Sequence, residues 1–190
     1  MLNFEYCNPT RIVFGADTIA QLAELVPTDV PILMTYGGGS IKRNGVYDQV
    51  KAALAGREII EFGGIEPNPL YETCMKAVAI CREKNVGFLL AVGGGSVADA
   101  TKFIAAGACY EGGDPWDLVS GTLAECMTPI GVVLTLPATG SESNGNAVIS
   151  RASTQEKLPM ISPNTFPTFS ILDPKTTFSL PANQVRNGIV

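Results

Sequence analysis

Three glycines and a serine stand directly behind an apolar run and directly ahead of a helical pattern, in the stretch FLLAVGGGSVADATK (88–102). At the carboxyl end of a buried parallel strand, glycines let backbone N–H groups approach a pyrophosphate because no Cβ atom intervenes. The following helix adds free N–H groups and the positive end of its dipole. Ser96 is predicted to cap this helix, with Asp99 completing a capping box. The alternative is that the stretch is only a capped helix behind a tight turn. One glycine would suffice for that, so we expect phosphate binding at 93–96.

The same tetrapeptide occurs once before, in ILMTYGGGSIK, where Gly37 to Ser40 also end a predicted strand. In dinucleotide sites an Asp or Glu at this place commonly binds the ribose hydroxyls and selects NAD. In this chain the end of the predicted strand is followed by glycines and Ser40 in place of an acidic residue, and Lys42 and Arg43 come next. Backbone N–H groups, a hydroxyl and a cation suit a 2′-phosphate. A plain turn is the alternative.

A third stretch, LTLPATGSESN (134–144), places four hydroxyl groups at and behind another predicted strand end. Hydroxyls and a side-chain amide suit recognition of ribose and carboxamide groups, and a serine-rich turn is the alternative. The chain contains no histidine and no G-x-S-x-G motif. A serine hydrolase, a Cys–His pair and a histidine-bound metal are therefore excluded for these residues.

The elements that must position these stretches alternate along the chain. Apolar runs predict strands at 11–15, 30–36, 58–62, 87–92 and 129–137, and helical periodicity predicts helices at 16–26, 45–54, 70–84 and 97–108. Continuous apolar strands are typical of a parallel sheet covered on both faces. We therefore expect an α/β fold with an open, mostly parallel sheet. After Pro137 the chain is rich in Ser, Thr, Asn, Gly and Pro, with at most short strands near 147–150 and 168–172.

The composition narrows the class of protein. The chain has 190 residues, a net charge of −5 and no run of basic residues, so nucleic acid and anionic membranes are not expected as partners. No apolar stretch approaches the roughly 20 residues of a membrane span, and no signal peptide is evident. Five cysteines without a C-x-x-C motif favour reduced thiols in a cytoplasmic protein. Cys74 and Cys81, seven apart on a predicted helix, are expected to be packing residues.

Taken together, the motifs resemble the metal-dependent (iron-containing) alcohol dehydrogenase family, and within it the NADPH-using, butanol-dehydrogenase-like aldehyde reductases. The matching stretches are TRIVFG, TYGGGSIK, EFGGIEPNP, LLAVGGGSVADATKFIA, LTLPATGSESN, AVISR, ILDP and LPANQVRNGIV. The resemblance implies a Rossmann-like cofactor domain of the dehydroquinate-synthase type over 1–178. It implies that 179–190 begin a helical metal-binding domain.

The resemblance also implies roles for particular residues. Gly38, Gly39 and Ser40 would meet the adenosine 2′-phosphate, and Asn68 would approach the adenosine end. Gly94, Gly95 and Ser96 would hold the pyrophosphate. The remaining implied contacts are with the nicotinamide side and its ribose, or with the cofactor more generally: Asp99, Thr135, Thr139, Ser141, Asn144 and Lys157.

In the family, one Asp and three His hold Fe²⁺ or Zn²⁺, and the Asp follows the NG[IV]V motif. This sequence ends on that motif, so we expect neither metal ligands nor catalytic residues in this chain, and a truncated, inactive piece of a longer enzyme. The implied activity is hydride transfer between NADP(H) and a small aldehyde or alcohol in a cytoplasmic homodimer. A stand-alone nucleotide-binding module, a glycerol dehydrogenase and a dehydroquinate-synthase-like enzyme are the alternatives; LPATGSES argues against the last two. The particular substrate, the metal and the oligomeric state stay open.

Overall fold

A parallel six-stranded sheet forms the centre of the molecule, in a computed structural model that describes residues 3, 5 and 7–187. Its strand order is β1-β8-β5-β4-β2-β3, and every neighbouring pair is parallel. The strands are β1 (Arg11–Phe14), β2 (Ile32–Tyr36), β3 (Ile59–Phe62), β4 (Phe88–Gly94), β5 (Ile130–Leu136) and β8 (Phe169–Leu172). The predicted open parallel α/β sheet is confirmed, with strand ends within two residues of those expected.

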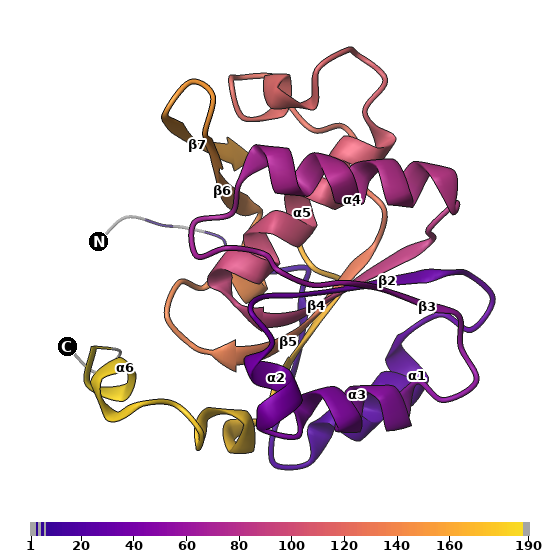
Figure 1. Cartoon of the computed structure of the whole chain (residues 1–190), viewed down its shortest axis with the longest axis vertical. Helices are drawn as coiled ribbons and strands as arrows, with labels where there is room; N and C mark the ends of the chain where they lie inside the picture. The colour runs from indigo at the N-terminus through magenta and orange to yellow at the C-terminus, as the bar shows by residue number, and fades with distance from the viewer. Residues whose placement is uncertain (1–2, 4, 6, 188–190) are drawn as a thin grey trace.

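Helices cover both faces of the sheet (Figure 1). On one face lie α4 (Tyr71–Glu83) and α5 (Gly95–Cys109). On the other lie α1 (Leu22–Leu25), α2 (Ser40–Arg43) and α3 (Val46–Ala53), with the 3₁₀ turn η1 (Thr18–Gln21) beside them. The central strands β2 and β4 are therefore almost wholly buried, which explains why their sequences are apolar at successive positions rather than alternating.

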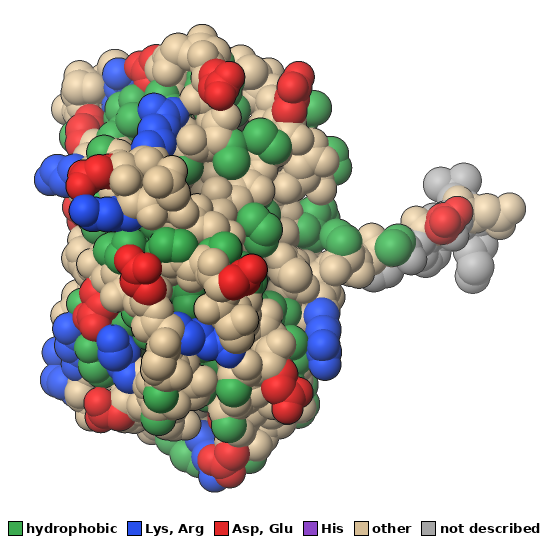
Figure 2. Space-filling model, turned by 90° about the vertical axis from the view of Figure 1, so that its right-hand side faces the viewer, with side chains coloured by type: hydrophobic (Ala, Val, Ile, Leu, Met, Phe, Trp, Pro, Cys, Tyr) green, Lys and Arg blue, Asp and Glu red, His purple; other side chains and the backbone are tan. Residues whose placement is uncertain are grey.

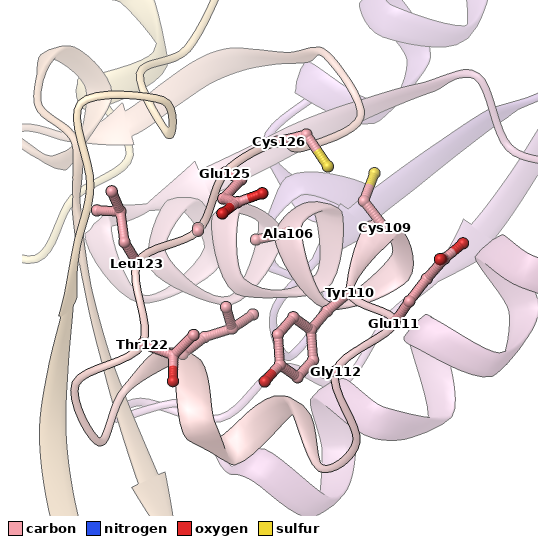
Figure 3. A pocket seen from close by; sticks show the side chains of 11 residues that line it. Ala106, Cys109, Tyr110, Glu111, Gly112, Thr122, Leu123, Glu125 and Cys126 are labelled. Atoms are coloured by element: carbon pink, nitrogen blue, oxygen red, sulfur yellow. The ribbon is translucent and has the colours of Figure 1, made fainter.

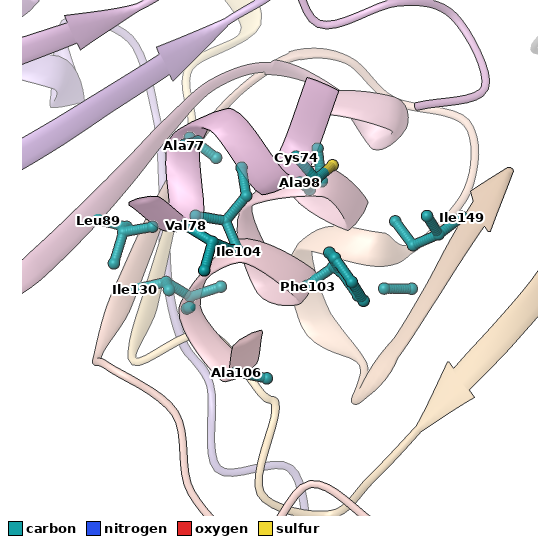
Figure 4. Packing of buried hydrophobic residues seen from close by; sticks show 14 of the residues in the cluster. Cys74, Ala77, Val78, Leu89, Ala98, Phe103, Ile104, Ala106, Ile130 and Ile149 are labelled. Carbon is teal, nitrogen blue, oxygen red and sulfur yellow. The ribbon is translucent and has the colours of Figure 1, made fainter. Parts of the chain in front are cut away.

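The core accordingly divides into two clusters, one on each side of the sheet. Small side chains let α4 and α5 pack closely against each other and the sheet, with Cys74, Ala77 and Ala98 at their contact (Figure 4). Cys74 is wholly buried and Cys81 is 4% exposed, so both are packing residues as predicted. Burial raises the pKa of the Cys81 thiol to about 12, which keeps it protonated and unreactive.

A second, antiparallel sheet of two strands lies outside the main one: β6 (Asn146–Arg151) and β7 (Glu156–Ile161). The sequence predicts β6 but not β7, because Pro159 interrupts the pattern. Pro159 pairs with Val148, whose N–H points away from β7 to a carboxylate oxygen of Asp99, 3.0 Å away. Val148 and Pro159 therefore form a non-hydrogen-bonded pair of the antiparallel sheet. A proline, which has no N–H group, breaks no hydrogen bond between the strands at such a position.

The last part of the chain contains short elements. Two 3₁₀ turns are η2 (Pro115–Leu118) and η4 (Pro174–Thr177), and a third, η3 (Ser141–Ser143), lies in the hydroxyl-rich stretch. The final helix described is α6 (Ala182–Asn187). Ser179 does not cap this helix: the Pro181 carbonyl accepts the N–H groups of Gln184 and Val185, and Ser179 Oγ accepts a hydrogen bond from the Asn44 side chain.

Acidic and basic side chains are intermingled on the face shown in Figure 2. This fits a chain with 13 basic and 18 acidic residues, and the view shows no broad area of one charge. In the described part of the chain, no helix is both long and apolar enough to cross a membrane.

Candidate cofactor-binding site

A cleft of about 340 Å³ opens where β2, β4 and β5 end. Both GGGS stretches line it, one from each of the two central strands, together with the end of β5. The cleft brings together seven of the thirteen residues named above: Gly38, Gly39, Ser40, Gly94, Gly95, Ser96 and Thr135. Two stretches that are more than fifty residues apart in sequence thus form one site.

The cleft lies where the path of the chain reverses across the sheet. From β2 the chain runs outward to β3, and it then returns to place β4 on the other side of β2. The segments that follow the two strands leave toward opposite faces, α2 and α3 to one and α5 to the other (Figure 1). Adjacent strand ends whose connections diverge leave a crevice between them, and open α/β sheets bind ligands in such crevices.

The second glycine run is required by packing. Cβ atoms built on the glycines at 93, 94 and 95 would lie 2.6 Å from Val97, 3.2 Å from Leu136 and 2.3 Å from Thr139. The argument that three glycines need a ligand to explain them is therefore wrong. The side chains of Val97, Leu136 and Thr139 each pack directly on one of these glycines and leave no room for a Cβ atom. The same contacts leave the backbone of 94–96 bare on the side that faces the cleft, so packing and ligand access are compatible.

Helix α5 begins at Gly95, immediately after β4, with Gly94 as its N-cap residue. The prediction that Ser96 caps the helix, with Asp99 closing a capping box, is wrong, because no side chain caps α5 and Ser96 lies inside its first turn. The first N–H groups of this 15-residue helix consequently have no side-chain acceptor in the described structure. Free N–H groups at the start of a long helix bind anions.

The first glycine run differs from the second. A Cβ on Gly37 would lie 3.3 Å from the Ile65 carbonyl oxygen, and Gly39 has a φ of +87°, so both have structural causes. Gly38 has neither: a Cβ there would meet nothing within 4 Å, and its φ is not in the left-handed region. Gly38 thus leaves open space in the wall of the cleft that folding does not require.

The cations beside this run are arranged unequally. The Lys42 ammonium lies 4.9 Å from the ring centres of both Tyr36 and Tyr47, and 3.7 Å from a carboxylate oxygen of Glu61. Its hydrogen bond with Tyr36 is the main cause that raises the pKa of Lys42. Arg43, by contrast, is exposed and has no hydrogen bond or ion pair among the described residues. Within the described structure, Arg43 is therefore an unpaired cation close to this run in sequence, although it is not one of the residues that line the cleft.

The hydroxyl-rich stretch closes over the start of α5. Thr139 packs on the Cα of Gly95 and its Oγ1 lies 2.8 Å from Ser141 Oγ. Ser141 is buried and interacts with Asp99, whose Oδ2 accepts the Val148 N–H. Burial raises the pKa of Asp99, and its Oδ1 is buried without a partner in the described structure. Asp99, Thr139 and Ser141 thus form a layer next to the cleft, outside the set that lines it.

Lys102 is a buried charged side chain beside the cleft that sequence reasoning missed. It is fully buried, and its ammonium group donates to the Asn144 carbonyl (2.7 Å), the Asn144 side-chain oxygen (3.0 Å) and the Asn146 carbonyl (2.8 Å). Burial lowers its pKa to about 8, an effect that Asp99 and Glu142 partly offset. Lys102 thereby ties the end of the hydroxyl-rich stretch to α5. It stands three residues after Asp99 in the quoted motif VGGGSVADATK, which was the available signal.

Asn68 and Lys157, the two remaining predicted contacts, meet each other. Lys157 Nζ, on β7, donates to Asn68 Oδ1 at 2.6 Å, and both side chains are exposed. Asn68 has a φ of 59°, a conformation that asparagine tolerates well. Neither residue lines the cleft itself, but Asn68 directly follows Pro67, which does.

Glu66 also lines the cleft and carried no sequence signal. One of its carboxylate oxygens accepts a hydrogen bond from Thr73 on α4 (2.7 Å), and the other is buried. The carboxylate is thus turned into the protein and is not presented as a ribose acceptor. Among the described residues, no group of three or more His, Cys, Asp or Glu side chains could hold a metal ion.

Comparison with known proteins gives these features a context. A family model described as iron-containing alcohol dehydrogenase matches residues 9–174. The chain is 56% identical over 193 residues to the NADPH-dependent aldehyde reductase YqhD of Escherichia coli, and 52% identical over 194 residues to a probable NADH-dependent butanol dehydrogenase of Bacillus subtilis. All of this chain is covered in both cases, but only 50% of each relative. The chain therefore spans about half the length of these curated relatives.

Solved structures of this family have the same fold as this chain. The crystal structure of Escherichia coli YqhD superposes with a TM-score of 0.94 at 56% identity, over 98% of this chain and 49% of that one. A butanol dehydrogenase from Thermotoga maritima, titled NADH-dependent, gives a TM-score of 0.92 at 46% identity, over 98% and 48%. The parallel sheet and its flanking helices are thus those of the corresponding half of these proteins.

Proposed function

Because the chain belongs to the iron-containing alcohol dehydrogenase family, we propose that it is the cofactor-binding half of an NADP-dependent alcohol dehydrogenase or aldehyde reductase. Such an enzyme transfers hydride between the nicotinamide and a small aldehyde or alcohol. The relatives named above include NADPH-dependent and NADH-dependent proteins, so the choice of cofactor must be argued from this chain's own cleft.

The observation that carries the choice of NADP is the open space at Gly38. A glycine that neither packing nor backbone conformation requires leaves room for a bulky group at the end of β2. No carboxylate is presented there to bond a ribose diol, since Glu66 is turned toward Thr73. The Gly39 and Ser40 N–H groups, the Ser40 hydroxyl and the free Arg43 would hold a 2′-phosphate.

The rest of the cofactor would follow the cleft toward β5. The backbone of Gly94, Gly95 and Ser96 would bind the pyrophosphate at the start of α5. The ribose and nicotinamide would lie near Thr135, with Thr139, Ser141 and Asn144 supplying hydroxyl and amide groups. Asp99 and Lys102 would hold this layer in place, and Asn68 with Lys157 would border the site. When bound, the nicotinamide supplies or accepts the hydride.

The family also implies a metal ion, but the described residues of this chain do not fit one, since they offer no ligand cluster. No step of a mechanism is therefore derived through a metal. We propose that residues 1–178 form the cofactor domain, and that 179–190 begin the part of the enzyme that would carry Fe²⁺ or Zn²⁺ and most substrate contacts.

A homodimer is part of the same proposal. Strand β1 is at the edge of the sheet, where β8 pairs with one side of it. It exposes Ile12 (46%) and Phe14 (73%) beside an edge that is free within the described chain. Apolar side chains next to an open strand edge favour pairing with another strand, and a second copy would supply one.

The test is the ratio of the NADH to the NADPH dissociation constant, measured from the fluorescence of the bound nicotinamide. One or two charge-assisted bonds, each worth about 1.5–3 kcal/mol, predict a preference for NADPH of at least about tenfold. Gly38→Asp fits without a clash and should reverse the preference, because the carboxylate repels the 2′-phosphate and accepts the ribose hydroxyls. Gly38→Ala adds a Cβ without charge and is the matched control.

A wild-type preference for NADH, or an unchanged ratio in Gly38→Asp, would contradict the assignment of the 2′-phosphate. Failure to bind either dinucleotide would instead contradict the proposed function as a whole. Binding without turnover in the intact protein, with aldehyde and metal added, would favour a non-catalytic nucleotide-binding module.

A further inference from the structure

Two of the five cysteines meet in a pocket at the other end of α5. Cys109 is the last residue of that helix, and Cys126 lies in the segment that leads to β5. Both line a pocket of about 490 Å³ together with Tyr110 and Glu125, and their sulfur atoms face each other across it (Figure 3). Cys126 is exposed and Cys109 is half-buried, so an oxidant in solution reaches the first thiol directly.

The segment that carries Cys126 is held on both sides of this residue. On one side, the carbonyl of the buried Ala124 accepts hydrogen bonds from Ser162 Oγ (2.8 Å) and Asn164 Nδ2 (3.1 Å). On the other, the Thr128 N–H donates to the Ala105 carbonyl in the last turns of α5 (3.3 Å). Tertiary contacts therefore hold the segment of Cys126 beside the end of α5, although sixteen residues separate the two cysteines in sequence.

We propose that Cys109 and Cys126 are a site of reversible oxidation that forms an intramolecular disulfide. With a peroxide as oxidant, the Cys126 thiolate attacks the O–O bond, becomes a sulfenic acid and releases water or an alcohol. The Cys109 sulfur then attacks the sulfenic sulfur, the S–S bond forms and a water molecule leaves with the proton of the Cys109 thiol. Two thiols are thus oxidised by two electrons and one peroxide is reduced, and a dithiol reductant reverses the step.

The groups around Cys126 determine how fast its thiol is oxidised. Burial, the contact with Cys109 and the nearby Glu125 and Glu111 carboxylates raise the pKa of the Cys126 thiol. The pair therefore reacts more slowly than an activated catalytic cysteine. The Cys109 thiol lies close enough to react with the sulfenic acid before it is oxidised further. The exposed Cys7 has no second thiol beside it within the described structure.

The experiment maps the oxidised cysteines in the intact protein. Native protein is treated with a small excess of hydrogen peroxide, quenched by alkylation and digested. Trypsin leaves both cysteines in one peptide, 103–151, because no Lys or Arg lies between Lys102 and Arg151. We expect this peptide to lose two hydrogen atoms and to resist alkylation. Further cleavage at the acidic residues between the cysteines should give two fragments that separate only after reduction.

Variants and a stability measurement complete the test. Cys126→Ser should abolish the cross-link, whereas Cys7→Ser should leave it unchanged. Oxidation should also raise the urea concentration at the midpoint of unfolding, since the bond closes a loop in the unfolded chain. The proposal is overturned if peptide 103–151 keeps two alkylatable thiols, if Cys126 is oxidised to the sulfinic acid instead, or if the product is a dimer linked through Cys7.

Discussion

The substitution Gly95→Ala tests how the cleft is built. The added methyl group would lie 2.3 Å from Thr139 Oγ1, 2.9 Å from its Cγ2 and 3.1 Å from its Cβ. Thr139 cannot rotate away freely, because it is β-branched and because its hydroxyl interacts with Ser141 Oγ and accepts the Ser141 N–H. The whole turn at 139–141 must therefore move away from α5.

The cost follows from these contacts. Overpacking costs about 1–3 kcal/mol in general. Because Thr139 is exposed to solvent and can shift outward, we expect the cost for Gly95→Ala near the lower end of this range. Losing the hydrogen bonds to Ser141 adds about 1 kcal/mol. The higher helix propensity of alanine returns at most about 1 kcal/mol, and less at the first helical residue. We expect Gly95→Ala to lower the free energy of unfolding by about 1–2 kcal/mol.

The assay is urea unfolding of the protein without cofactor, with Gly38→Ala as the matched control. Gly38 lines the same cleft, but its Cβ would meet nothing within 4 Å, so the control should be as stable as the wild type or slightly more stable. At this size, the loss corresponds to a melting temperature lower by about 2–8 °C. Equal stability of Gly95→Ala and wild type, or equal loss in both variants, would refute the packing argument.

Two further predictions concern the buried charges beside the cleft. Lys102→Met should lower the free energy of unfolding by about 2–4 kcal/mol at neutral pH, because carbonyls at 144 and 146 lose their donor. The pKa of Lys102 is about 8 in the folded state and 10.5 ordinarily, so the unfolded state binds more protons between these two pH values. The stability of the wild type relative to Lys102→Met should therefore increase as the pH rises from about 8 to about 10.5, as measured by urea unfolding. For Asp99, burial raises the folded pKa above 3.8, so the folded state binds more protons. Relative to Asp99→Asn, the wild type should therefore lose stability as the pH rises above about 3.8, again measured by urea unfolding; a constant difference would count against this.

The sequence predicts the main sheet well because its central strands, β2, β4 and β5, are buried on both faces, so each reads as an unbroken apolar run ended by glycine or proline. It also places the two GGGS stretches at strand ends, and the pairing of β2 with β4 then brings them into one cleft. The strand β7 escapes prediction because Pro159 is tolerated only through its pairing with Val148. No local pattern reveals that partner.

The roles of individual side chains depend still more on tertiary contacts. Lys102 looks like an ordinary helical lysine, and only the approach of 144–146 encloses it in carbonyl groups. The reason for Gly94 and Gly95 is likewise invisible in sequence, since Leu136 and Thr139 come from about forty residues away. Distant contacts of this kind also separate the residues that line the cleft from those that support it.

The strand order has a consequence for how the molecule is made. Among the described strands, β1 pairs with β8 alone, so the first strand finds its partner only when Phe169–Leu172 have been synthesised. At about 5–20 residues per second, the intervening chain takes roughly 10–30 s to emerge from a ribosome. Through that interval β1, with the exposed Phe14, waits as an unpaired apolar segment, while β2, β3 and β4 can already associate. Synthesis therefore assembles the sheet from its middle outward, and the N-terminal strand is among the last to join.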